Sequence, residues 1–361
     1  MLVLQQTVIA DYRQAVLELV AQRLGSQFAI YAGAHTADRS IATGVTLPSH
    51  LRRIRNVFIG KFAIWQIGAL VRVVLARYVI LELNPRIVNV WIALLLRRAI
   101  GRKSALWGHA WGRRGRGSGT TLRDAMCLLG GRIISYSATD ASAFSARLPN
   151  AVVTVAPNAL YRQIDIYANP HAAARNIVYV GRLIPSKKPD LLLEGFRRAR
   201  ERLPSGTRLS VVGDGPMKVQ LRNWVEKVGL ASHVDFLGHI SNLPSLRELF
   251  ALSLVSVSPG YVGLSLTQSH SFGVPMIYGK DEPHSPEIEA ARDDFNAIPF
   301  GTSSAASLAD VMERVFANRQ AWIARRAAIA QLCADKYSVE AMADGLIQGA
   351  GYSHNKRESN F

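Results

Sequence analysis

The sequence predicts an α/β protein made of two doubly wound domains. Short apolar runs alternate with longer segments whose apolar residues recur every three or four positions, a pattern typical of βαβ units. The chain has 361 residues, about the length of two domains, and its strand-like runs are too many for one small sheet. These runs are Phe28–Ala32, Tyr78–Leu83, Ser104–Trp107, Arg132–Tyr136, Ala151–Val155, Ile177–Val180, Arg208–Val212, Val234–Leu237, Leu254–Ser258 and Pro275–Tyr278. Helices are expected at Arg13–Leu24, Pro189–Leu203 and Val219–Val228.

A change in composition indicates where the two domains meet. Residues 1–150 hold 20 Lys and Arg against 6 Asp and Glu, whereas the rest of the chain holds 23 against 20. This bias ends near Ala156–Arg175, a stretch with Pro157, Asn158 and Pro170 that is typical of a linker. We therefore expect an N-terminal domain over residues 1–160 and a C-terminal domain over 171–335. A helix over 336–352 is expected to pack back towards the N-terminal domain, followed by a flexible tail over 353–361.

Composition narrows the class of protein. Hydrophobic residues make up 49% and charged residues 19% of the chain, as in globular proteins. Two cysteines, Cys127 and Cys333, are too few for a disulfide framework. No apolar run is long enough to span a bilayer, and the N-terminus lacks the basic segment and cleavage site of a secretory signal. We expect a cytoplasmic protein.

The net charge of +17 is carried mainly by the N-terminal half, which favours an anionic partner. Trp65, Trp91 and Trp107 lie in apolar surroundings near the basic residues. Basic and apolar residues together suit an anionic membrane on the inner face of the cell that carries a lipid-linked sugar, although a solvated basic face is the alternative. The absence of a recognition helix, zinc finger or RNP-like motif argues against nucleic acid. The basic clusters are Arg52, Arg53 and Arg55; Arg97, Arg98, Arg102 and Lys103; and Arg113, Arg114 and Arg116.

Three strand ends in the C-terminal half carry residues suited to an anionic ligand. Arg182 and Lys187 follow the strand that ends near Gly181, and two cations before a helix can hold a pyrophosphate, or can be a solvated loop. Gly213 and Gly215 follow the next strand, and Gly238, His239 and Ile240 follow the third. Ligands of open α/β sheets bind beyond the carboxyl ends of strands, so one shared pocket is expected.

A fourth strand end continues into a glycine-rich turn. Gly260 to Gly263 precede a helix that is expected to begin near Leu264, where backbone N–H groups suit a phosphate. Gln268 lies one helical turn further on and can reach the same ligand. His270 and His284 are interpreted as structural or rim residues.

These motifs, in their order, resemble a known family. GRLIPSKK, VVGDGP, FLGHIS and GLSLTQSHSFGVPMI resemble the donor half of a GT-B glycosyltransferase, specifically the large retaining family 4. In the N-terminal half, ADYRQAVLELVAQRL, ILELNPR and ALWGHAWGRRGRG are similar to the acceptor domain of polysaccharide-assembly members. VTVAPNAL resembles the passage between the domains. The resemblance implies a GT-B fold, in which two Rossmann-like domains face each other across a cleft.

The resemblance also implies roles for particular residues. Arg182 and Lys187 would bind the donor diphosphate, and His109 would lie near the transferred sugar. Gly238, His239 and Ile240 would meet the base of a UDP- or GDP-linked sugar, and Gly263 and Leu264 would hold the distal phosphate. Members of that family commonly have two Glu at the positions where this chain has Gly260 and Gln268, and Glu287 and Glu289 are nearby acidic candidates. The residues expected to bind the donor are Gly181, Gly213, Gly215, Gly238, His239, Ile240, Gly260, Gly263, Leu264, Gln268 and Glu287. The residues expected to contact the acceptor or the membrane are Arg97, Arg98, Arg113 and Arg114.

The implied activity is sugar transfer with retention to a lipid-linked or polysaccharide acceptor in cell-surface polysaccharide biosynthesis. No Asp-x-Asp motif is present, so we expect neither a metal nor another cofactor besides the nucleotide sugar. Gly260 cannot make the sugar contact of a glutamate. It therefore leaves open a non-transferring protein of the same fold, such as a sugar-nucleotide epimerase or a degenerate binding subunit.

Overall fold

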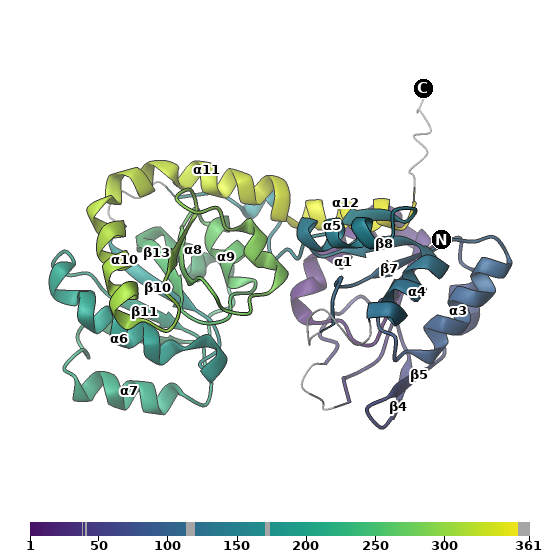
Figure 1. The fold of residues 1–361 in the computed structure, drawn as a ribbon, viewed down its shortest axis with the longest axis horizontal. Coiled ribbons are helices and arrows are strands. Elements are labelled where there is room, and N and C mark those ends of the chain that lie inside the picture. Colours follow the sequence, from purple (N-terminus) through teal and green to yellow (C-terminus); the bar gives the residue numbers. More distant parts are fainter. Residues whose placement is uncertain (38, 40–41, 113–119, 170–173, 353–361) are drawn as a thin grey trace. The chain divides into compact units, whose positions relative to one another are not determined.

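The computed structural model describes residues 1–37, 39, 42–112, 120–169 and 174–352. It confirms the predicted α/β class. The chain divides into two compact units, which Figure 1 shows. The N-terminal unit comprises Met1–Leu160 and Val339–Phe361, and the C-terminal unit comprises Tyr161–Ser338. No helix of the described residues is long and apolar enough to cross a membrane.

The N-terminal unit is built on a parallel sheet with the order β3-β2-β1-β6-β7-β8-β9 in the described residues. The order reverses between β1 and β6, which pair side by side. Its strands are β1 (Leu2–Gln6), β2 (Phe28–Ala32), β3 (Leu51–Arg53), β6 (Tyr78–Glu82), β7 (Ser104–Trp107), β8 (Gly131–Ser135) and β9 (Val152–Val155). A separate antiparallel hairpin is formed by β4 (Arg55–Ile59) and β5 (Ala63–Ile67).

Helices cover the N-terminal sheet and bury its apolar side chains. They are α1 (Gln14–Leu24), α2 (Leu70–Leu75), α3 (Val88–Ala99), α4 (Thr120–Gly130), α5 (Ala138–Arg147) and, from the end of the chain, α12 (Val339–Gly349). The last helix joins the N-terminal core through Val339, Met342 and Leu346, which are buried with residues of α1. A Cβ at Gly345 would lie 2.3 Å from the carbonyl oxygen of Val155, so a glycine is needed where α12 meets β9.

The C-terminal unit is built on a second parallel sheet, with the order β12-β11-β10-β13-β14-β15. The order reverses between β10 and β13, so loops after these two strands flank a topological switch point. Its strands are β10 (Asn176–Val180), β11 (Leu209–Val212), β12 (Val234–Gly238), β13 (Ser253–Ser258), β14 (Met276–Gly279) and β15 (Ala297–Phe300). Its helices are α6 (Pro189–Ala199), α7 (Lys218–Lys227), α8 (Leu243–Leu252), α9 (Ser265–Ser271), α10 (Ala305–Ala317) and α11 (Arg319–Tyr337).

Arg97 does not lie on a basic surface, so its assignment to the acceptor or membrane is wrong. The side chain is fully buried, and its guanidinium donates to the carbonyl oxygens of Val73 and Ala76 at 2.8 and 2.6 Å. It also donates to Lys103 O and Ser104 Oγ. Burial lowers the pKa of Arg97 to about 10. Arg97 therefore ties α3 to the end of α2 and the start of β7.

The other residues assigned to the membrane have different outcomes. Arg98 is exposed on α3, next to the buried Arg97, so its role stays a prediction. Arg113 and Arg114 lie outside the described residues. Trp107 is buried in the N-terminal core and is not a surface aromatic residue, whereas Trp65 is exposed on β5.

Candidate active site

The two glycine-containing loops of the C-terminal unit meet at the switch point between β10 and β13. The first loop follows β10 and ends in a 3-10 turn, Pro185–Lys187. The second follows β13 and begins at Pro259 and Gly260. Ser186 O accepts a hydrogen bond from Tyr261 N at 2.9 Å, and Lys187 Nζ donates to Tyr261 O at 2.6 Å. The structure therefore brings together Lys187 and the turn at Gly260, which lie far apart in the sequence.

Gly260 is needed because the first loop lies directly against it. A Cβ at this position would be 2.4 Å from Ser186 O and 2.8 Å from the carbonyl carbon of Lys187, closer than real Cβ contacts. The backbone that would collide belongs to the loop with the two cations. A glutamate, which the family resemblance implied at this position, would not fit this arrangement, and Gly260 instead lets the loop approach.

Lys187 is half-buried, and its charge is sensitive to its surroundings. Burial lowers the pKa of the Lys187 amine to about 8; the positive charge of Arg182 acts in the same direction, and Glu287 opposes both. The ammonium also lies 4.7 Å from the centre of the Tyr261 ring. Arg182 itself is exposed. Two cations close enough to affect each other are a surface on which an anion would be stabilised.

The adjacent Lys188 fixes the end of the same loop. Its backbone is left-handed, with a φ of 49°, an uncommon conformation for a residue with a side chain. Lys188 Nζ forms an ion pair of 2.5 Å with Glu282 Oε1 and donates to Ser303 Oγ at 2.8 Å. Lys188 therefore holds the loop from one side while Lys187 contacts Tyr261 on the other.

Two of the glycines assigned to the donor give room for neighbouring loops. Gly213 and Gly215 have φ values of +135° and +157°, and a Cβ would lie 1.9 Å from Gly181 O or 2.4 Å from Leu183 O. Gly181 N donates to Val212 O, and Gly213 N donates to Gly238 O. The ends of β10, β11 and β12 are thus joined side by side by backbone hydrogen bonds. These contacts place the loops and leave donor binding by the glycines a prediction.

The remaining donor candidates differ in how open they are. Gly238 has a φ of +71° and open space around its Cβ position, and His239 beside it is exposed. Ile240 packs against the cluster around Phe250. Gly263 and Leu264 precede α9, which has seven residues and therefore a small dipole. Gln268 Nε2 donates to Tyr161 Oη at 2.9 Å, which fixes the amide.

Two histidines near the site are structural, in line with the expectation. His270 is buried, with Nε2 2.9 Å from Asn296 O, and burial lowers its pKa to about 4. His284 Nδ1 accepts from Val262 N at 3.1 Å, so Nε2 carries the proton and donates to Gly279 O at 2.8 Å. His284 therefore supports the turn after Gly260. Glu287, in the 3-10 turn Pro286–Ala290, is buried.

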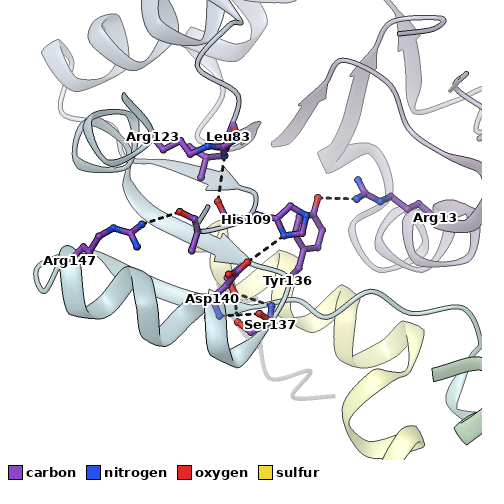
Figure 2. Close-up of polar contacts among 10 residues, drawn as sticks. Arg13, Leu83, His109, Arg123, Tyr136, Ser137, Asp140 and Arg147 are labelled. Carbon is purple, nitrogen blue, oxygen red and sulfur yellow. Dashed lines mark hydrogen bonds and ion pairs between the residues drawn. The ribbon is translucent and has the colours of Figure 1, made fainter. Parts of the chain in front are cut away.

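In the N-terminal unit, His109 follows β7 and lies in a polar cluster (Figure 2). Its Nδ1 is 3.4 Å from Oδ2 of Asp140, in the first turn of α5. The carboxylate can only accept, so Nδ1 carries the proton and Nε2 is left as the acceptor. The ring packs on Tyr136 with centroids 4.5 Å apart. Half of the His109 side chain remains exposed, so it is held without being covered.

Arg13 extends this cluster towards β1. Its guanidinium donates to Tyr136 Oη at 2.9 Å and to Gln6 Oε1 at 2.8 Å (Figure 2 shows the first of these). It also lies 4.3 Å from the centre of the Trp107 ring. Neither Arg13 nor Asp140 was expected at the site. No sequence spacing links them to His109, because they come from separate elements that only the parallel sheet brings together.

Comparison with known proteins decides the family. The family described as Glycosyl transferases group 1 matches residues 167–347, half of the chain. The chain belongs to this glycosyltransferase family. The match covers most of the C-terminal unit, including the cation-bearing loop after β10 and the glycine-containing turn after β13, and continues into α12.

Curated relatives are similar over part of their length. A GDP-mannose-dependent alpha-(1-6)-phosphatidylinositol monomannoside mannosyltransferase of Mycolicibacterium smegmatis is 29% identical over 113 residues, which cover 29% of each chain. Putative glycosyltransferase EpsD of Bacillus subtilis is 26% identical over 140 residues, 39% of this chain and 36% of that protein. The chain thus spans about a third of the length of these relatives.

Solved structures show the fold. HepE of Anabaena, crystallised with UDP, has a TM-score of 0.66 at 15% identity and covers 98% of this chain and 99% of its own. The lipopolysaccharide outer core galactosyltransferase WaaB has a TM-score of 0.67 at 12% identity and covers 97% and 99%. These likenesses support the GT-B architecture of two Rossmann-like domains.

The lowered pKa of Lys187 predicts a pH-dependent affinity for a nucleoside diphosphate. The amine is charged below its pKa of about 8 and neutral above it, so affinity should hold on the acid side and fall as the pH rises. The fall should approach about tenfold per pH unit. Isothermal titration calorimetry measures the affinity at each pH, above about pH 7.5 where the phosphates are fully ionised. In Lys187→Arg the cation persists and the profile should be flat. A wild-type profile that stays flat to about pH 9 would contradict the role of Lys187.

Proposed function

We propose that this glycosyltransferase transfers a sugar, with retention, from a nucleoside diphosphate sugar to a lipid-linked or polysaccharide glycan, in the manner of family 4. The observation that carries the proposal is the contact of the Lys187 loop with the turn at Gly260. It gathers two cations and the start of α9 beyond the carboxyl ends of β10 and β13. A diphosphate is the ligand whose charge and size suit this arrangement.

The central requirement of the reaction is to stabilise the negative charge that develops on the leaving diphosphate. As the bond to the sugar lengthens, negative charge accumulates on the phosphate oxygens, and Arg182 and Lys187 are preorganised to stabilise it. Loss of one such donor costs about 2.7–4 kcal/mol in comparable oxyanion sites. Two side-chain cations can supply this stabilisation without a divalent metal, so we propose a metal-independent reaction in which the diphosphate itself accepts the proton of the acceptor.

We propose UDP or GDP as the nucleotide of the donor. HepE was crystallised with UDP, and the mycobacterial mannosyltransferase depends on GDP-mannose. Gly238, His239 and Ile240 would meet the base, and the Oε1 of Gln268 can accept from a ribose hydroxyl, since its Nε2 is held by Tyr161. Glu287 is the candidate for the sugar contact that Gly260 cannot make, because its charge already reaches Lys187.

We place the acceptor side at the N-terminal unit. His109 would contact the transferred sugar through its exposed edge, and Asp140 would orient the ring. WaaB is a galactosyltransferase of the lipopolysaccharide outer core, and the mycobacterial enzyme is a mannosyltransferase of phosphatidylinositol monomannoside. A glycan or lipid-linked glycan acceptor, met at an anionic membrane surface inside the cell, completes the proposal.

Because Gly260 cannot make the sugar contact of a glutamate, a second function is considered: a sugar-nucleotide epimerase or a degenerate binding subunit. The two functions differ in what happens to the donor. An epimerase converts the nucleotide sugar with no acceptor present, and a binding subunit converts nothing. Proton NMR of the nucleotide sugar after incubation with the protein alone, and then with acceptor lipids, separates the three cases.

Thermal unfolding with UDP, GDP, ADP and CMP tests the donor site. A nucleotide present at about 100 times its dissociation constant adds about 2.7 kcal/mol to the free energy of unfolding. We expect UDP or GDP to stabilise the wild type, and Arg182→Ala and Lys187→Ala to lose most of that shift. Lys227→Ala, which removes an exposed cation at the end of α7, serves as the matched control and should respond as the wild type does. Equal shifts in all variants would contradict a diphosphate site at this loop.

The contact between Asp140 and His109 predicts a kinetic effect. In Asp140→Asn the side chain keeps its size but no longer fixes the proton on Nδ1, so the tautomer and ring orientation of His109 are lost. We expect kcat to fall by about tenfold or more, with little change in the KM for the donor. The pH dependence of kcat should also change. Wild-type kcat in this variant, or loss through KM alone, would show that Asp140 does not position His109.

A further inference from the structure

We propose that the outer face of the β4–β5 hairpin docks this protein on an anionic lipid bilayer. The hairpin face is defined by Val57, Ile59, Phe62, Trp65 and Ile67. This surface of the N-terminal unit was not predicted from the basic clusters in the sequence. The inference rests on the part of the proposed function that sets the acceptor in a membrane.

Strand pairing puts the apolar residues on one side of the hairpin. Val57 is opposite Trp65, and Arg55 is opposite Ile67. Residues two apart on a strand share a face, so these side chains point the same way. Phe62, at the turn, is 87% exposed, Ile59 56% and Ile67 49%. An exposed two-stranded element with an apolar face would promote aggregation unless a partner covers it.

The inner side of the hairpin is fixed to the N-terminal unit by polar contacts. Asn56 Nδ2 donates to Thr7 O at 2.8 Å, and Gln66 N donates to Asn89 Oδ1 at 2.6 Å. Gln66 is buried, and its Oε1 accepts from Gln5 Nε2 at 2.6 Å. Ile64 and Phe58 belong to the adjoining core cluster. The hairpin is therefore held from the inside, and its outer apolar side chains take no part in that attachment.

The charge around the hairpin selects the partner. Residues 51–103 contain eleven Lys and Arg and one acidic residue, Glu82. The carboxylate of Glu82 is engaged, with Thr7 N donating to it at 2.6 Å and Asn84 at 3.0 Å. Arg55 shares the apolar face, and Lys61 is exposed beside Phe62. Exposed aromatic and aliphatic residues with the exposed cations Arg55 and Lys61 among them fit the interface of an anionic bilayer.

A second copy of the chain fits this face less well. A two-fold contact would bring the same patch of each copy together, so Arg55 and Lys61 of one copy would face the same cations of the other. Like charges across an interface are unfavourable. The bilayer supplies the opposite charge and an apolar interior in the same partner. It is the occupant that the residues favour.

Vesicle co-sedimentation of the full chain tests the proposal. Vesicles of phosphatidylcholine alone are compared with vesicles that contain phosphatidylglycerol, at low and high salt. We expect binding to the anionic vesicles only. Phe62→Asp should lower the partition coefficient by about tenfold, and Lys61→Glu by about fivefold or more. Val219→Asp changes a 70% exposed apolar residue on α7 of the C-terminal unit and serves as the matched control.

Each outcome of the co-sedimentation experiment either supports or overturns docking of the hairpin face on a bilayer. Loss of binding in the hairpin variants but not in Val219→Asp supports the proposal. Absent binding, equal binding to neutral vesicles, or equal loss in all variants overturns it. A wild-type dimer in light scattering that Phe62→Asp dissociates, without vesicle binding, shows that a second copy covers the face. Thermal shifts with UDP and GDP on the same variants test folding and the donor site separately, so a failed donor site is not mistaken for a failed docking surface.

Discussion

The site in the C-terminal unit depends on the close approach of two backbones at the switch point of its sheet. The loop after β10 lies so near the turn after β13 that a Cβ at Gly260 would be 2.4 Å from Ser186 O. This contact puts Lys187 over Tyr261 and partly removes it from water. Partial burial in turn lowers the pKa of Lys187. The position and the charge of the candidate catalytic cation thus follow from the lack of a side chain at one residue.

The N-terminal unit places a different set of polar residues at the end of the same kind of parallel sheet. Its order also reverses, between β1 and β6, and polar residues again gather beyond the strand ends. His109 contacts Asp140 and Tyr136, Arg13 holds Tyr136, and half of the His109 side chain is exposed. The hairpin inserted before β6 joins this edge through Asn56 and Thr7. In our proposals, the histidine near the transferred sugar and the membrane-docking face thus belong to one unit, as a lipid-linked acceptor would require.

Much of the fold could be predicted because most strands are short apolar runs bounded by turn residues. The ranges for β2 and β7 match their predicted ones, since polar or turn residues bound both sides. β1 was missed: Leu2–Gln6 is buried throughout, so it shows no alternation. Arg97 was misassigned from its neighbours. It follows Val90, Ala93 and Leu94 at helical spacing on the buried side of α3, and this periodicity separates it from Arg98.

The contacts within the sites could not be predicted from the sequence. Motif order brought Arg182, Lys187 and Gly260 into one hypothesis, but the backbone contact that explains Gly260 joins residues far apart in the chain. The pairing of His109 with Asp140 likewise depends on the parallel order of β7 and β8. Residue spacing along the chain predicts neither contact, because each depends on the order of strands within its own sheet.

The affinity of Gly260→Ala for UDP and GDP tests the central claim most directly. The added methyl group must displace the loop that carries Lys187, so we predict at least about a tenfold loss of affinity, with Lys187 returning towards its ordinary pKa. Gly112→Ala is the matched control, since no atom of the described residues lies within 4 Å of its Cβ position. Wild-type affinity in Gly260→Ala would contradict the account, because the contact at Gly260 would then not position the cations.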